Sequence, residues 1–154
     1  MDETPIPNQK IRMSFYDASD GPRIMLFGPM DVDIGALQQT FRMLSHGNGS
    51  IQLDAEDFIV PFGGIRLLAK SSGPIHAGAK HEGRQGILKR SKTSPQFDWI
   101  RSSEGWDYLA ELIDSLVHSK IAAHQYLTQY PRDDAIVVVS KGEYSDDMRN
   151  LTVA

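Results

Sequence analysis

The sequence predicts a single α+β domain in which two amphipathic helices pack on one face of a mainly antiparallel sheet. Three observations lead to this fold class. Residues 32–46 and 103–119 carry apolar side chains at helical spacing. Several short segments alternate apolar and polar side chains or are rich in β-branched residues, which is typical of strands. The 154 residues are the usual length of one domain, and 40% of them are apolar.

The first half is expected to contain a hairpin, one helix and three further short strands. Residues 17–22 are dense in turn-forming residues and separate the first two strands. Pro61 places one later strand at a sheet edge, because proline cannot donate a hydrogen bond to a neighbouring strand. The strands are predicted at residues 11–16, 23–27, 50–53, 58–62 and 65–70. The helix presents one apolar face made of Ile34, Leu37, Phe41 and Leu44.

The second half is expected to contain one helix and three strands. Ser102 or Ser103 is suited to cap the start of this helix. Residues 135–140 are β-branched and nearly continuously apolar, which predicts a central strand that is buried on both faces. The other strands are predicted at residues 97–100 and 122–128. The apolar face of the helix consists of Trp106, Leu109, Ile113 and Leu116.

The order strand, helix, strand, strand occurs twice in the chain. Residues 22–72 and 97–144 are therefore interpreted as two βαββ units within one domain at 10–154, preceded by a flexible tail at 1–9. An offset of 72 residues superposes Leu37 on Leu109 and Phe41 on Ile113. Any two amphipathic helices would superpose in this way, so a chance match stays open. If both helices cover one face of a shared sheet, the other face needs a partner or a polar cover.

The charge is unevenly distributed along the chain. The net charge is −4, yet residues 73–96 hold five Lys or Arg against one Asp or Glu. This glycine-rich segment is predicted to be a long surface loop between the two units, able to bind an anion, a nucleic-acid backbone or an acidic protein. A solvated linker and a hairpin anchored by Ile75 and by Ile87 and Leu88 are the alternatives. The candidate binding residues are Lys80, His81, Arg84, Lys89, Arg90 and Lys92.

The sequence contains no established catalytic motif. The absence of cysteine excludes disulfides, thiolate metal sites and a thiol nucleophile. No histidine pair has metal-ligand spacing, and neither a metal nor a cofactor is predicted. His124, Tyr126 and Asp133 form one candidate acid–base cluster, although His124 with an ordinary hydrogen bond is the simpler interpretation. Acidic pairs such as Asp133–Asp134 are interpreted as solvated turns.

The N-terminus is acidic and broken by prolines, unlike a secretory signal. The longest apolar runs are a handful of residues, far short of the ~20 needed to span a membrane. The sequence therefore predicts a cytoplasmic protein that does not enter the membrane.

Part of the second half resembles a known group of proteins. Residues 106–112, 124–127 and 136–144 resemble the small bacterial immunity-type proteins of polymorphic toxin systems, and the likeness extends over about residues 97–144. The resemblance implies a non-enzymatic cytoplasmic protein that binds and blocks one partner. The sequence thus favours a non-catalytic, immunity-like protein that binds another protein. Anion or nucleic-acid binding through residues 76–92 and a small enzyme without a recognisable motif stay open as alternatives.

Overall fold

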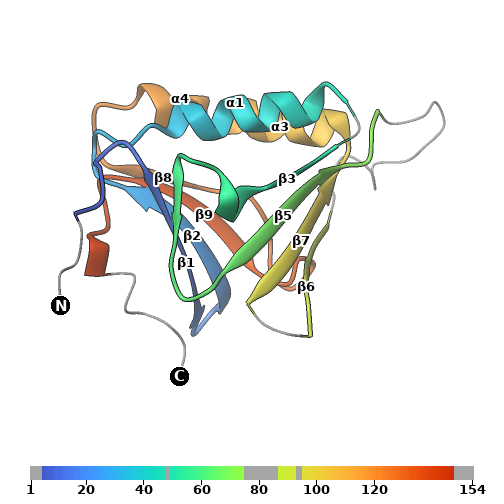
Figure 1. Cartoon of the computed structure of the whole chain (residues 1–154), viewed down its shortest axis with the longest axis horizontal. Coiled ribbons are helices and arrows are strands. Elements are labelled where there is room, and N and C mark those ends of the chain that lie inside the picture. The colour runs from blue at the N-terminus through green and yellow to red at the C-terminus, as the bar shows by residue number, and fades with distance from the viewer. Residues whose placement is uncertain (1–4, 48, 75–86, 93–94, 148–154) are drawn as a thin grey trace.

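The computed structural model describes residues 5–47, 49–74, 87–92 and 95–147. A layer of helices lies along the top of Figure 1, and two sheets lie beneath it, slanting toward each other away from the helices. At that far end, the rings of Phe15 and Phe97 meet with their centroids 5.3 Å apart. The predicted α+β class is confirmed. No helix within the described ranges is long and apolar enough to cross a membrane.

The larger sheet has five strands. Their order across the sheet is β4 (Ile59–Pro61), β1 (Ile11–Ala18), β2 (Gly21–Gly28), β9 (Ile136–Lys141) and β8 (Ala123–Tyr126). β9 is an internal strand, as its β-branched composition predicted, and it runs parallel to β2 and antiparallel to β8. β4 is an edge strand, as Pro61 predicted.

The smaller sheet has four strands. Their order is β3 (Ser50–Gln52), β5 (Arg66–Ser71), β7 (Gln96–Arg101) and β6 (Ile87–Arg90). β5 and β7 run parallel, and the two outer strands are antiparallel to their neighbours. A single 3-10 turn at Leu53–Ala55 follows β3.

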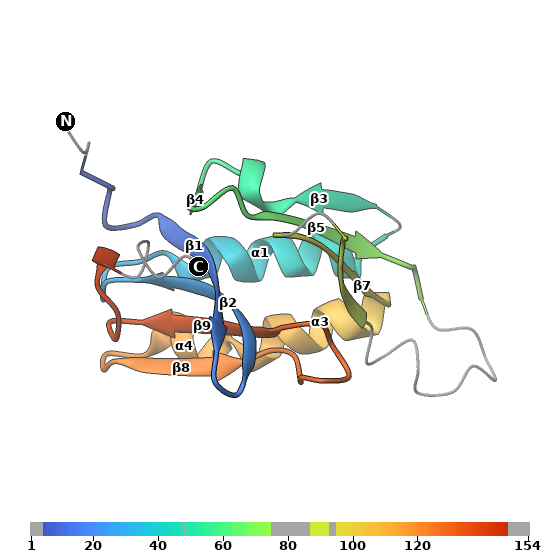
Figure 2. The ribbon, with the colours of Figure 1, turned by 90° about the horizontal axis from the view of Figure 1, so that it is seen from below.

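The helices form where their spacing predicted them. α1 (Ile34–Ser45) begins at Asp33, whose carboxylate accepts a hydrogen bond from the Ala36 amide. α3 (Ser103–Leu112) begins at Ser102, whose hydroxyl accepts from the Gly105 amide, and the short α4 (Asp114–His118) continues it. α1 and α3 lie side by side, as Figure 2 shows from below. Every predicted core residue is buried: Leu37, Phe41, Leu44, Trp106, Leu109, Ile113, Leu116, Val137 and Val139.

The strands divide between two sheets instead of lying in one. Nine strands side by side would span roughly 40 Å at about 4.8 Å per strand, whereas two adjacent helices cover about 20 Å. Both sheets contain strands from both halves of the chain, since β2 pairs with β9 and β5 pairs with β7. The second strand of each of the hairpins β1–β2 and β6–β7 thus pairs with the last strand of the other half.

The predicted surface loop at 73–96 is wrong for residues 87–90, which form β6. Leu88 of this strand is fully buried opposite Trp99, so its burial outweighs the neighbouring positive charges. Residues 75–86 and 93–94 lie outside the described residues, as do residues 1–4 of the predicted tail. From residue 5 onward that tail has defined contacts: the carbonyl of Gln9 accepts a hydrogen bond from the Asp33 amide.

Candidate functional site

A cavity of about 390 Å³ opens between the C-terminal half of α3 and the end of β8. The end of β7 and the α3 helix that follows it line one part, and β8 with its following loop lines the other. Arg101, the last residue of β7, lies at one side, and α3 adds Tyr108 and Leu112. Tyr126 at the end of β8 and Arg132 in the following loop complete the wall. The cavity thus combines two guanidinium groups with aromatic and apolar surface.

Arg101 is 5% exposed. Burial lowers the pKa of Arg101 to about 10, because the low-dielectric surroundings disfavour the charged form. The negative charge of Asp133 opposes this shift, and the nearby positive charge of Arg132 adds to it. Arg101 is therefore still cationic at neutral pH, and two positive charges meet one buried negative charge.

Asp133 is a structural residue of the loop that ends the cavity. Its carboxylate is 1% exposed and accepts hydrogen bonds from the Leu88 amide at 2.9 Å and the Gln129 amide at 2.9 Å. It also pairs with the Arg132 guanidinium at 3.0 Å. The interpretation of Asp133 as part of a solvated acidic turn is wrong, since this carboxylate joins the loop to the edge of the smaller sheet.

Asp134 continues the same connection. Its carboxylate accepts from the Arg90 amide at 2.7 Å, and its own amide donates to the Leu88 carbonyl at 2.9 Å. The backbone groups of Leu88 and Arg90 point away from β7 in the strand register. Together with the Asp133 contact, these bonds satisfy both outward groups of Leu88 and the outward amide of Arg90. The two adjacent aspartates therefore block the open edge of β6.

Three large aromatic side chains are exposed on and beside the cavity. Tyr108 is 53% exposed, Tyr126 46% and Tyr130 47%. Tyrosine and arginine are the residue types most enriched at energetically important positions of protein interfaces. No composition or spacing signal pointed to this surface, because its residues come from separate elements.

The predicted acid–base cluster forms only in part. The rings of His124 and Tyr126 lie 5.3 Å apart in an edge-to-face contact. Asp133 belongs instead to the loop contacts described above. The carboxylate that meets His124 is Glu143, which lies 3.0 Å from the His124 Nδ1 atom and which the sequence did not indicate.

The hydroxyl of Ser140 lies in the same cluster. It donates to Glu143 at 2.6 Å. Within the described ranges, no group of three His, Cys, Asp or Glu side chains could hold a metal ion. Glu143 therefore lies between a histidine and a serine, and these contacts anchor the segment that follows β9.

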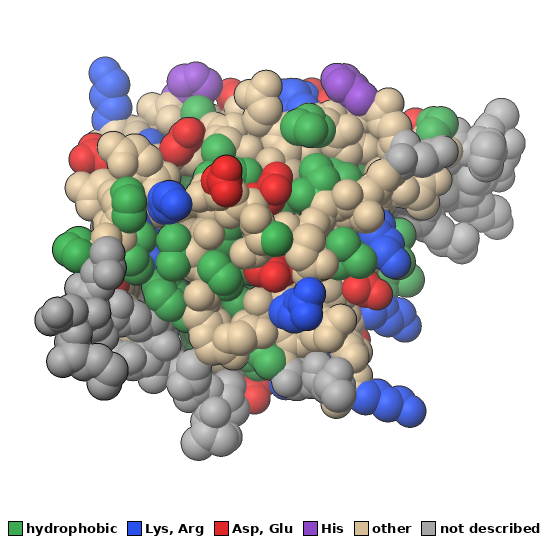
Figure 3. Space-filling view, viewed as in Figure 1, with side chains coloured by type: hydrophobic (Ala, Val, Ile, Leu, Met, Phe, Trp, Pro, Cys, Tyr) green, Lys and Arg blue, Asp and Glu red, His purple; other side chains and the backbone are tan. Residues whose placement is uncertain are grey.

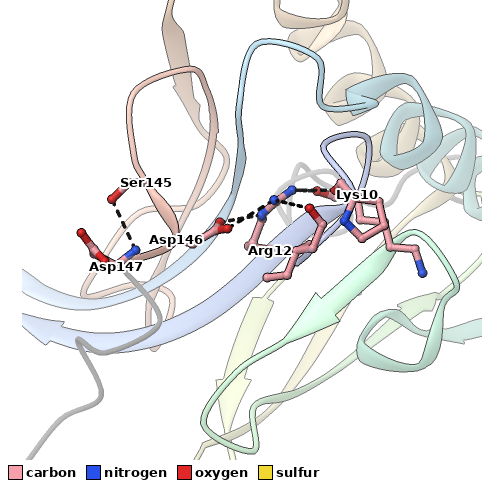
Figure 4. Close-up of polar contacts among 7 residues, drawn as sticks. Lys10, Arg12, Ser145, Asp146 and Asp147 are labelled. Carbon is pink, nitrogen blue, oxygen red and sulfur yellow. Dashed lines mark hydrogen bonds and ion pairs between the residues drawn. The ribbon is translucent and has the colours of Figure 1, made fainter. Parts of the chain in front are cut away.

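That segment, residues 142–147, lies on the sheet face opposite the helices. Figure 4 shows the guanidinium of Arg12 pointing toward Asp146, with a 2.8 Å contact between Arg12 Nε and the carboxylate. Arg12 also donates to the Lys10 carbonyl at 2.6 Å. The Tyr144 ring meets Phe27 edge to face, with centroids 6.4 Å apart. The second face of the sheet thus has both an apolar and a polar cover supplied by its own chain.

The contacts of Glu143 stabilise residues 142–147 to a degree that depends on pH. Burial raises its pKa, but hydrogen bonds from Ser140 and His124 outweigh that effect, so the pKa lies below the ordinary 4.5. The stabilisation is complete above pH 4.5 and is lost as the pH falls through the lower pKa of the folded state.

We expect Glu143→Gln to lower the Tm at about pH 6 and to change it much less at about pH 3. Thermal unfolding at both pH values, followed by circular dichroism, tests this; an equal loss at both would contradict it.

The predicted basic cluster is not assembled by the described residues. Lys80, His81 and Arg84 lie outside them. Lys89 and Arg90 are adjacent in β6 and point to opposite faces; Arg90 lies 4.7 Å from the Phe15 ring centroid. Lys92 follows the strand. The face seen in Figure 3 carries basic and acidic side chains interspersed with apolar ones, so it does not form a field of one sign.

Comparisons of the chain with protein-family models, with curated proteins and with solved structures gave no match.

Proposed function

We propose that this chain is a non-catalytic protein-binding domain, and that its contact surface is the Arg101–Arg132 cavity together with Tyr108, Tyr126 and Tyr130. The observation that carries the proposal is the meeting of two guanidinium groups with two exposed tyrosines, Tyr108 and Tyr126, around one cavity. A third exposed tyrosine, Tyr130, follows the lining residue Gln129 in the chain. A partner that presents an Asp or Glu side chain fits this chemistry, because guanidinium groups bind carboxylates with paired hydrogen bonds. The tyrosine rings supply rigid contact area around that charge.

Hydrogen bonds within the chain fix the loop that forms part of the cavity wall. The Thr128 hydroxyl donates to the Ala135 carbonyl at 2.7 Å and accepts from the Val137 amide at 2.8 Å. In the same loop, the Asp133 carboxylate accepts from the Gln129 amide, and the Asp133 amide donates to the Gln129 carbonyl. A preformed wall reduces the entropy lost on association, which favours a binding role for this surface.

Reversing the charge of Arg132 should abolish or strongly weaken partner binding. We expect Arg132→Glu to reduce affinity at least about tenfold, because a carboxylate would then face a carboxylate. The matched control is Lys89→Glu, which makes the same charge change on the exposed side of β6. Both variants and the wild type are used to capture proteins from the source cell, and calorimetry measures affinity for the purified protein.

The proposal is supported only by a captured protein that Lys89→Glu retains and Arg132→Glu loses. Equal retention by the two variants would contradict it. Inhibition of the partner, which the resemblance to immunity proteins implies, is a further part of the proposal. It predicts that the partner's activity falls on addition of the wild type and recovers with Arg132→Glu.

A further inference from the structure

The edge strands β6 and β8 differ in whether other parts of the chain bond their outward backbone groups. β6, at the edge of the smaller sheet, has its outward backbone groups satisfied by Asp133 and Asp134. β8, at the edge of the larger sheet, pairs with β9 on one side, and no described strand pairs with its other side. Figure 2 shows β8 along the lower margin of the ribbon. An unpaired edge offers a row of backbone donors and acceptors to a second chain.

The strand register identifies which backbone groups face outward. The Leu127 amide donates to the Val137 carbonyl at 2.8 Å, so the backbone N–H of Leu127 points toward β9. In an antiparallel pair every second residue is bonded to the neighbouring strand. Gln125 therefore faces β9, whereas His124 and Tyr126 direct their backbone groups to the open side. The Gln125 side chain reaches the Tyr126 carbonyl at 3.2 Å, which leaves both outward amides to bind an added chain.

The open edge leads directly to the cavity. Tyr126 is the last residue of β8 and also lines the cavity, next to Gln129 and Arg132 of the following loop. Ile121, 74% exposed, lies just before the other end of the strand. A chain laid along β8 would therefore contact an apolar side chain at one end and reach two guanidinium groups at the other.

We propose that an extended segment of the partner protein adds to the free edge of β8 as an extra strand and places an Asp or Glu side chain in the Arg101–Arg132 cavity. This inference rests on the proposed function and adds the binding mode to it. Backbone hydrogen bonds to His124 and Tyr126 provide affinity, and the acidic side chain provides specificity. Charge complementarity with the two arginines favours an acidic segment over a basic or neutral one.

A library of random twelve-residue peptides displayed on phage, selected on the full chain, tests the inference. We expect the enriched peptides to share one Asp or Glu within a run of β-branched or aromatic residues. On binding such a peptide, amide hydrogen exchange at His124 and Tyr126 should slow at least about tenfold, while Gln125 and Leu127 change little. Replacing the acidic residue of the peptide by its amide should weaken binding at least about tenfold.

Two N-methylated versions of the enriched peptide form the matched control. Methylating the backbone nitrogens that face β8 should abolish binding, and methylating the alternate nitrogens should leave it within about threefold. No enrichment, equal binding of both methylated peptides, or unchanged exchange at His124 and Tyr126 would overturn strand addition.

The outcomes separate the two proposals. If a peptide binds and Arg132→Glu abolishes binding while exchange at His124 and Tyr126 is unchanged, the cavity remains the contact surface and strand addition fails. If exchange slows but Arg132→Glu binds normally, the edge is used and the cavity assignment fails.

Discussion

Asp133→Ala should lower the free energy of unfolding by about 3–5 kcal/mol. The carboxylate is 1% exposed and accepts from the amides of Leu88 and Gln129, so its removal leaves two backbone donors without their acceptor. The same change removes the negative charge beside Arg101 and Arg132. Urea unfolding followed by far-ultraviolet circular dichroism measures the loss.

Two variants serve as controls for Asp133. Asp133→Asn keeps one carbonyl oxygen in place and should lose about half as much stability. Asp134→Ala removes the contact to the Arg90 amide at a less buried position and should cost about 1–2 kcal/mol. If Asp133→Ala were no more damaging than Asp134→Ala, the carboxylate would not be the central link between the loop and β6.

Trp106→Ala should also lower the free energy of unfolding by about 3–5 kcal/mol. Trp106 is fully buried, and its ring centroid lies 5.0 Å from that of Trp99 and 5.3 Å from that of Phe41. These three rings join both helices to the smaller sheet. The indole N–H donates to the Lys70 carbonyl at 2.8 Å, so truncation also leaves a backbone acceptor without its donor.

Trp106→Phe separates the two contributions. It keeps most of the apolar contact and loses the hydrogen bond to Lys70, so it should cost less than the alanine variant. Chemical unfolding monitored at 222 nm compares both variants with the wild type, which avoids dependence on tryptophan fluorescence. A loss below about 1 kcal/mol for Trp106→Ala would show that the aromatic cluster does not hold the helices on the sheet.

The helices and the central strand could be predicted because their signals are local. The spacing of Leu37 and Phe41 in α1 is that of one helical face, and the β-branched residues of β9 mark an internal strand. β6 was only the alternative to a surface loop, because only Leu88 of its four residues is buried, and its stability depends on aspartates more than forty residues away. No periodicity within so short a segment can report such contacts.

The candidate site was missed for a related reason. Arg101 and Tyr108 are close in sequence, but Arg132 lies in the loop after β8, and only the folded chain brings this loop to the end of β7 and to α3. Asp133 was named, but as a possible member of an acid–base cluster with His124. The residue type alone does not distinguish a solvated turn carboxylate from one that satisfies buried backbone amides. Glu143, the carboxylate that does meet His124, follows β9 and comes within reach only because β8 and β9 pair.

Nuclear magnetic resonance of the arginine and tyrosine side chains tests directly whether the partner contacts the Arg101–Arg132 cavity. The captured partner protein is added to the labelled chain, and the Nε–Hε signals of Arg101 and Arg132 are followed with the ring signals of Tyr108 and Tyr126. If the partner binds at the cavity, these signals should shift or broaden, while the backbone amide signals of Lys89 and Asp98 on the outer face of the smaller sheet should not change. Perturbation confined to residues away from the cavity, with Arg101 and Arg132 unchanged, would contradict it.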